Sequence, residues 1–166
     1  MFLTDKQIEA LQRTHSILEG FIDWKTQLQP NGFDLTVREV HEFLSEGSID
    51  FTNEQRTLPE TRRLCFKDGW LKLVSGAYKI STNEVVRVPR NVIAFAFPRS
   101  SLLRMGAFTA HAVWDAGFYG RGEFLLTVEN PYGIRLRENA RVAQLVFFKL
   151  SSPPEKVYFG IYRGKK

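Results

Sequence analysis

PRSSLLRMG (residues 98–106) and HAVWDAGFYG (residues 111–120) are the two stretches that decide the fold of this chain. The first follows residues 92–97, which are apolar on both faces of an extended segment and therefore predict a buried strand. The second places Asp115 between an apolar pair and a turn punctuated by glycines. Each stretch thus carries polar side chains where a predicted strand ends.

The side chains of the first stretch suit a phosphate ligand. Arg99 can donate two parallel hydrogen bonds to a phosphate, and Ser100 and Ser101 add hydroxyl and backbone donors. Arg104 lies one helical turn beyond Ser100 and can face the same ligand. The alternative interpretation is a solvated helix cap followed by a surface arginine.

The second stretch suits chemistry on a water molecule. A carboxylate at Asp115 can orient and deprotonate water, although capping the turn is the commoner role of an aspartate in this setting. Phe118 or Tyr119 can stack on a sugar or a base. His111, taken alone, is more often a structural histidine than a catalytic one.

Three other segments hold candidate site residues. In QPNGFDL (29–35), Asp34 interrupts an apolar alternation and needs a partner, which can be a metal ion or an arginine. In the last apolar strand, the Gln144 amide can read a base or pair with a backbone group. The C-terminal tail, with Tyr162 and Arg163, is either a flap over phosphates or a frayed basic end.

The remaining pattern predicts a mainly β chain with one N-terminal helix. The helix is expected over residues 4–19, because its apolar residues lie on one face and Thr4 and Gln7 have the spacing of a capping box. Gly20 follows as a stop signal.

Strands follow the helix at intervals that turn signals separate. They are expected over 33–37, 92–97, 123–129 and 141–150, together with a hairpin of 71–74 and 77–80. Residues 45–69 are expected to be irregular, and residues 151–166 to form a tail. The length of 166 residues (1–166) suits a single domain.

The composition excludes several classes of protein. Hydrophobic residues at 43% and charged residues at 25% are typical of a globular chain, not a disordered or collagen-like one. No apolar run approaches the roughly 20 residues of a membrane span, and no signal peptide is visible, so we expect a cytoplasmic protein without a membrane partner. The single cysteine, Cys65, disfavours a zinc-dependent deaminase, which needs paired cysteines. The net charge of +5 favours anionic ligands such as nucleotides.

Taken together and in this order, four segments resemble the superfamily of dUTPases and dCTP deaminases, and most closely the archaeal dUTPase family. The matching segments are QPNGFDLTVREV (29–40), VPRNVIAFAFPRSSLLRMG (88–106), AVWDAGFYGRGE (112–123) and RLRENARVAQLVFFKL (135–150). The resemblance implies a β-clip, jelly-roll-like fold and a homotrimer with active sites between subunits. It also implies hydrolysis of dUTP to dUMP and pyrophosphate with Mg²⁺, a reaction that supplies dUMP.

The resemblance further implies roles for individual residues. Asp115 matches the aspartate that activates the water. Arg99, Ser100 and Ser101 match the motif that holds the phosphates. Asp34 matches an acid that is linked to the metal through water.

Recognition of the nucleoside is implied in the same way. Phe118 and Tyr119 flank the position of the aromatic ring under the deoxyribose, and Gln144 matches the glutamine of the fourth motif. The hairpin 113–127 would recognise uracil through its backbone. Such a slot can discriminate uracil from cytosine, because the edges of the two bases have opposite donor and acceptor patterns.

Two departures from the family pattern leave alternatives open. The deaminase branch has a glutamate in the strand after the aspartate, but the two possible alignments place Thr127 or Leu125 there. Glu123 and Glu129 fit only if the alignment shifts, although odd positions of an extended strand share one face. The glycine-rich final motif of ordinary dUTPases is missing, and residues 162–166 are all that remains of it.

The sequence therefore predicts a dUTP diphosphatase, with a dCTP deaminase or a bifunctional deaminase and diphosphatase as the alternative. A nucleotide-binding regulator without turnover is a third possibility, which the intact Asp115 opposes. Nucleic acid is not an expected partner, because no stripe of interleaved cations and aromatics is visible in the sequence.

Overall fold

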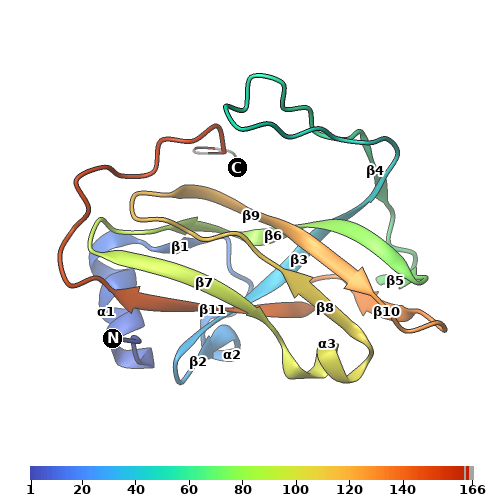
Figure 1. Cartoon of the computed structure of the whole chain (residues 1–166). Helices are drawn as coiled ribbons and strands as arrows, with labels where there is room; N and C mark the ends of the chain where they lie inside the picture. Colours follow the sequence, from blue (N-terminus) through green and yellow to red (C-terminus); the bar gives the residue numbers. More distant parts are fainter. Residues whose placement is uncertain (163, 165–166) are drawn as a thin grey trace.

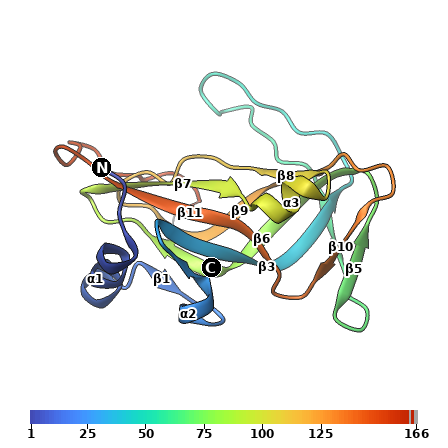
Figure 2. The ribbon, with the colours of Figure 1, turned by 90° about the horizontal axis from the view of Figure 1, so that it is seen from below.

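The computed structural model describes residues 1–162 and 164, and this part of the chain is mainly β, as predicted. Its strands are β1 (Leu18–Glu19), β2 (Leu28–Gln29), β3 (Gly32–Phe43), β4 (Thr61–Leu64), β5 (Trp70–Leu73), β6 (Gly76–Arg87), β7 (Val92–Pro98), β8 (Ala107–Ala110), β9 (Tyr119–Val128), β10 (Ile134–Arg137) and β11 (Arg141–Lys149). Among the described residues, nine strands join one sheet, whose main path runs β7-β11-β3-β6-β9-β8. Figures 1 and 2 show this sheet as curved layers that enclose the core.

The N-terminal helix α1 (Asp5–His15) begins as predicted and ends earlier than expected. Both hydrogen bonds of the Thr4–Gln7 capping box are present. The expected end at residue 19 is wrong, because Ser16 adopts a left-handed conformation (φ 48°) and the chain then forms β1, which pairs with β6. The packing of β1 on the sheet outweighs the helical pattern at this point.

The prediction of a single helix is also wrong, since two short helices follow. They are α2 (Trp24–Gln27) and α3 (Ser100–Arg104). The Asp23 side chain caps α2 by accepting a hydrogen bond from the Thr26 backbone N–H at 2.7 Å. Helices of four and five residues leave no periodic pattern that a sequence can reveal.

The predicted hairpin of 71–74 and 77–80 does not form. Instead, β5 pairs with β10, which lies some 60 positions further along the chain, and β6 pairs with β3 and β9. The strand β4 also lies inside the segment that was expected to be irregular, because Arg62 and Arg63 hide its alternation. Both corrections come from long-range pairing, which local sequence does not encode.

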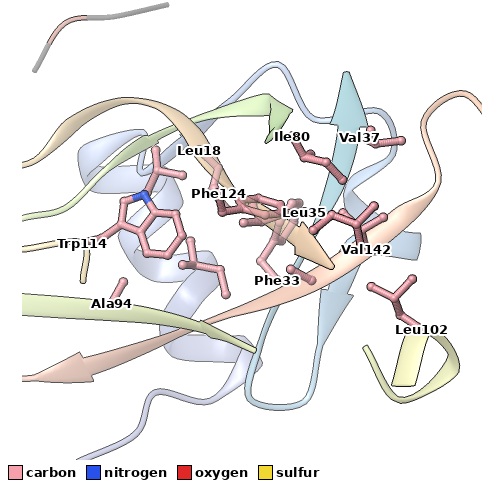
Figure 3. Close-up of a cluster of buried hydrophobic side chains, with 14 of the residues drawn as sticks. Leu18, Phe33, Leu35, Val37, Ile80, Ala94, Leu102, Trp114, Phe124 and Val142 are labelled. Carbon is pink, nitrogen blue, oxygen red and sulfur yellow. The ribbon is translucent and has the colours of Figure 1, made fainter. Parts of the chain in front are cut away.

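The core lies between the layers of the folded sheet. Phe33, Leu35 and Val37 alternate along β3 and are fully buried. Figure 3 shows Phe124 next to Leu35 in this core and Trp114 on the side of Ala94. Burial of each large side chain stabilises the fold by about 1.5–3 kcal/mol.

Two connections position the candidate site residues. Trp114 and Ala94 form an isolated bridge, with hydrogen bonds of 3.0 Å in both directions, so the segment before Asp115 is fixed against β7. The C-terminal tail returns over this segment, because the Tyr158 N–H donates to the Ala116 carbonyl at 2.8 Å. No helix of the described residues is long and apolar enough to cross a membrane.

Candidate active site

A cavity of about 720 Å³ opens on the face of β9 that the tail and the β3–β4 loop overhang. It is lined by aromatic and apolar side chains with a few polar ones. The lining residues are Phe43, Leu58, Pro59, Thr61, Lys79, Ala112, Val113, Trp114, Asp115, Phe118, Arg121, Gly122, Glu123, Phe124, Leu125, Tyr158 and Tyr162. An apolar cavity with a few convergent polar groups is typical of a small-molecule site.

Asp115 lies on the wall of this cavity in a tightly hydrogen-bonded loop. Its carbonyl accepts a hydrogen bond from the Phe118 N–H at 3.0 Å, and the Gly117 N–H donates to the Val88 carbonyl at 2.9 Å. The Asp115 side chain itself is exposed. A rigid backbone thus presents a solvated carboxylate, which suits a group that must contact water.

Phe118 lines the cavity, whereas Tyr119 does not. The Phe118 ring lies 5.4 Å from the ring of Tyr158 in the tail. Tyr119 is directed towards the N-terminal segment, where Arg87 covers its ring at 4.2 Å and its hydroxyl donates to Glu19 at 3.3 Å. Of the two aromatic candidates for a sugar contact, the structure therefore brings only Phe118 to Asp115.

The middle of β9, residues 121–125, supplies one wall of the cavity. Glu123 is among the lining residues, which agrees with the face predicted for it, and its carboxylate lies 3.5 Å from Lys79 Nζ. Leu125 also lines the cavity, whereas Thr127 and Glu129 do not.

His111 lies behind the cavity wall. Its ring contacts those of Phe124 and Trp114, at centroid distances of 4.3 and 5.8 Å, and Nε2 pairs with the Thr109 hydroxyl at 2.8 Å. Burial lowers the pKa of His111 from 6.5 to about 4, so the ring is neutral near pH 7. Nδ1 is buried and has no hydrogen-bond partner among the described residues. This geometry supports a structural role.

A second cluster is defined by Asp34, Arg99 and Arg141, and it is called the phosphate cluster after the ligand that the sequence predicts for Arg99. Asp34 is 1% exposed, and its Oδ2 lies 3.2 Å from Arg99 Nε and 3.1 Å from Arg141 Nη1. Of the two partners that the sequence allows for Asp34, the structure shows arginine. Burial raises the pKa of Asp34, and the two guanidinium groups act in the opposite direction.

Gln144 joins the phosphate cluster through the register of the sheet. It lies opposite Asp34 on β3 and opposite Phe97 on β7. Gly32 permits this close approach, because a Cβ there would lie 2.6 Å from the Leu145 carbonyl oxygen and 2.9 Å from Gln144 Nε2. The glycine of the PNG turn is therefore required by packing of β3 against β11.

The remaining predicted site residues lie in two places. Ser100, Ser101 and Arg104 belong to α3 and are exposed next to Arg99. Tyr162 lines the cavity with Asp115. Arg163 lies outside the described residues.

The two groups of residues are separated within one chain. Ala94 pairs with Trp114, the neighbour of Asp115, whereas Arg99 comes five positions later, beyond the end of β7. Five residues of extended chain span about 16 Å. Asp115 and Arg99 therefore do not meet within this chain.

Sequence reasoning missed several residues that build these sites. Arg141 was visible as the first residue of the segment that carries Gln144, but only the three-dimensional pairing shows its contact with Asp34. Lys79 and Tyr158 reach the cavity from β6 and the tail. Glu84 on β6 directly follows three polar residues, so the local sequence did not mark it as a buried carboxylate.

The chain belongs to the dCTP deaminase-like family, whose sequence profile matches residues 2–150. A solved structure, a 2'-deoxycytidine 5'-triphosphate deaminase from Agrobacterium tumefaciens, shares the fold with a TM-score of 0.65 at 22% identity. The match covers 88% of this chain and 47% of that chain, so the present chain spans about half of that protein.

Within this family, the chain is similar to archaeal proteins named probable deoxyuridine 5'-triphosphate nucleotidohydrolase. The protein from Methanosarcina mazei is 46% identical, over 90% of this chain and 88% of its own length. The protein from Archaeoglobus fulgidus is 45% identical, over 98% of this chain and 96% of its own. The predicted resemblance to archaeal dUTPases is thereby confirmed.

Proposed function

We propose that this protein is a dUTP diphosphatase, which hydrolyses dUTP to dUMP and pyrophosphate. The observation that carries the proposal is the cavity that presents Asp115 beside Phe118. Relatives with this name at 45–46% identity, aligned over most of both chains, support the same substrate. We also place the reaction in the cytoplasm, where nucleotide pools are handled.

Asp115 acts as the general base in the proposed reaction. It accepts a proton from a water molecule, whose oxygen forms a bond to the α-phosphorus of dUTP. The bond from that phosphorus to the bridging oxygen breaks, and pyrophosphate leaves with the electron pair. Arg99, with the donors of Ser100 and Ser101, binds the phosphate chain and stabilises its charge. Gln144 and Arg104 lie beside these residues and complete the group that binds the phosphate chain.

The residues of the phosphate cluster fit a Mg²⁺ ion only if the nucleotide supplies most of the ligands of that ion. Asp34 is the carboxylate nearest Arg99, and two arginines share its Oδ2, so an indirect contact through water suits it better than direct coordination. Mg²⁺ commonly keeps several waters and binds substrate phosphates with one or two carboxylates. When bound, the ion supplies positive charge to the phosphates.

The distribution of the site over two clusters supports a homotrimer with active sites between subunits. Asp115 and Arg99 lie too far apart to act together within one chain. Phe97 and Leu103, which flank Arg99, are 56% and 53% exposed and form an apolar surface for a neighbouring subunit to cover. In the assembly, Arg99 of one subunit then meets Asp115 of another.

The nucleoside occupies the cavity. Phe118 packs against the deoxyribose, and the backbone of the hairpin 113–127 reads the uracil edge. Tyr158 and Tyr162 cover the bound nucleotide from the tail, with Arg163 as the predicted cation for the phosphates. Exclusion of water from the cavity strengthens each of these polar contacts.

A product assay tests the proposal. The protein is incubated with Mg²⁺ and, separately, dUTP, dCTP, dTTP or UTP, while pyrophosphate, ammonia and the nucleotide product are measured. We expect dUMP and pyrophosphate from dUTP alone. If binding occurs and no pyrophosphate is released, the chain is a nucleotide-binding regulator and the proposal is wrong.

The same assay tests dCTP deamination, the second candidate. The position of Glu123 on the cavity wall favours retaining this alternative, because a carboxylate there can contact a bound base. Its pairing with Lys79 and the presence of Leu125 two residues further oppose it. Release of ammonia from dCTP would establish deamination and would mean that Glu123 or Glu129 occupies the position of the deaminase glutamate.

A further inference from the structure

A buried carboxylate that the proposed mechanism does not use lies on β6, behind the phosphate cluster. Glu84 is fully buried. Its Oε1 accepts hydrogen bonds from Gln27 Nε2 at 2.7 Å and from Thr36 Oγ1 at 2.6 Å, and its Oε2 accepts one from the Thr36 N–H at 2.9 Å. Burying a carboxylate costs desolvation free energy. The three donors that surround the Glu84 carboxylate offset this cost and fix its position.

The donors of Glu84 lead directly to Asp34. Gln27 Nε2 also donates to the Asp34 carbonyl oxygen at 2.8 Å. Thr36 lies two residues beyond Asp34 on the same face of β3. Glu84 thus fixes the backbone of β3 on both sides of Asp34, once through Gln27 and once through Thr36.

The network continues on the far side of Asp34 to Arg99 and Arg141. Both guanidinium groups lie within 3.2 Å of the Asp34 carboxylate. Asn83, the neighbour of Glu84, donates to Thr36 Oγ1 at 3.0 Å and to Asn139 Oδ1 at 2.9 Å, close to Arg141 in sequence. Polar contacts therefore run from the buried Glu84 through the β3 backbone at Asp34 and Thr36 to the partly exposed cations of the phosphate cluster.

A role in stability alone would not require a buried carboxylate with three hydrogen-bond donors. The interior between β3 and β6 is filled elsewhere by apolar side chains, and well-packed apolar residues often stabilise a core as much as a buried polar network. The polar residues are concentrated on the one face of β3 that carries Asp34. Because of this arrangement, we expect these polar residues to act on the phosphate cluster and not on the nucleoside cavity.

We propose that Glu84 is a positioning residue, which acts through Gln27 and Thr36 to hold Asp34 where it orients Arg99 towards the phosphate chain. The inference rests on the proposed function, because it concerns the phosphate end of that same site. It predicts that loss of the Glu84 contacts weakens binding of a phosphate chain while the nucleoside cavity is unaffected.

Binding of two separate ligand fragments tests this role. Inorganic tripolyphosphate with Mg²⁺ probes the phosphate cluster, and 2'-deoxyuridine probes the cavity, each by titration calorimetry. We expect Glu84→Gln to weaken tripolyphosphate binding at least fivefold, because an amide cannot accept all three hydrogen bonds. The affinity for 2'-deoxyuridine should stay within twofold of the unmodified chain.

A matched control sharpens the test. Thr82→Val removes a fully buried hydroxyl from the same strand, which contacts the Glu84 carbonyl and the Gly122 N–H but not Asp34. It should lower stability and leave tripolyphosphate affinity within twofold.

The outcomes separate this inference from the proposed function. A folded Glu84→Gln variant with unchanged tripolyphosphate affinity overturns the positioning role alone, as does an equal loss in Thr82→Val. If Glu84→Gln does not fold, Thr36→Val carries the test, since it removes only one of the three contacts. An unmodified chain that neither binds tripolyphosphate nor hydrolyses dUTP overturns both proposals.

Discussion

Asp115 is the residue on which turnover depends in the proposed reaction. Asp115→Asn keeps the shape of the side chain and removes its basicity, so we expect turnover of dUTP to fall by at least 10²-fold, within the range for loss of a general base. Affinity for a non-hydrolysable dUTP analogue should change little. Steady-state kinetics and calorimetry measure the two quantities, and turnover that persists would remove Asp115 from its role.

Arg99 should contribute to binding and not only to catalysis. Arg99→Ala removes a charge-assisted donor to the phosphates and leaves Asp34 with Arg141 alone. We expect the affinity for the same dUTP analogue to fall by about 1.5–3 kcal/mol. Arg104→Ala, at the exposed end of α3, provides a comparison, and we expect it to weaken binding less. An unchanged affinity in Arg99→Ala would contradict the assignment.

His111 should make the protein sensitive to acid. Its folded-state pKa of about 4 lies below the ordinary 6.5, so on acidification the unfolded chain takes up the proton first. The free energy of unfolding should therefore be constant above pH 6.5 and fall between pH 6.5 and 4, by up to about 3 kcal/mol.

Denaturant unfolding at several pH values checks this dependence. His111→Phe keeps the ring contacts and should flatten the pH profile. His15→Gln, at the exposed end of α1, serves as the control and should not. Parallel profiles for His111→Phe and the unmodified chain would show that another group is responsible.

At the scale of elements, a single substitution can test the contact between the tail and the Asp115 loop. Gly117 has φ +87°, and a Cβ there would lie 2.7 Å from Val157 Cβ. We expect Gly117→Ala to displace the tail and to lower stability by about 1–2 kcal/mol through backbone strain. Faster tryptic cleavage after Lys156 would report the displacement.

Gly69→Ala is the matched control for this experiment. Gly69 also has a positive φ (+75°), but a Cβ there meets nothing within 4 Å. The control therefore imposes similar backbone strain without a contact to the tail. Equal cleavage rates in the two variants would argue that Gly117 does not hold the tail in place.

The elements show how far the sequence determines this structure. The strand β3 was predictable from the alternation over residues 33–37, and β11 from its nearly continuous apolar run. The partner of β5 was not, because pairing of Trp70–Leu73 with Ile134–Arg137 depends on the whole sheet. Short α2 and α3 carry too few residues to show a helical period.

The site was predictable to the same limited degree. Asp115, Phe118 and Tyr162 share one cavity, and Asp34, Arg99 and Gln144 share one cluster, a division that the sequence did not predict. The sequence offered no means of finding Lys79 in the cavity, because it lies in no motif, whereas Tyr158 belongs to the tail that was considered as a flap. Tyr119 shows the converse error, because it packs under Arg87 and contacts Glu19 instead of entering the cavity.

At the scale of the whole molecule, the separation of the two clusters makes a prediction about assembly. Sedimentation should show a trimer, and a stable, active monomer would contradict sites shared between subunits. Asp115→Asn and Arg99→Ala subunits, each inactive alone, should regain activity when mixed and reassembled. Random mixing in equal amounts makes about a quarter of the sites intact.

The control for this experiment is a mixture of each variant with itself after the same treatment. It should stay inactive. Recovery of activity in the mixed sample shows that the two residues of one working site come from different chains. Absence of recovery in properly assembled trimers would place both residues in the same chain.

Cys65 gives this protein a ready position for spectroscopy. It is the one thiol of the sequence, it is exposed, and it directly follows β4, which leads out of the loop that supplies Leu58 and Pro59 to the cavity wall. A maleimide dye therefore attaches at a single defined position in each chain without any engineered substitution. Its emission can follow the entry and departure of nucleotide in real time, in the same sample whose turnover is measured.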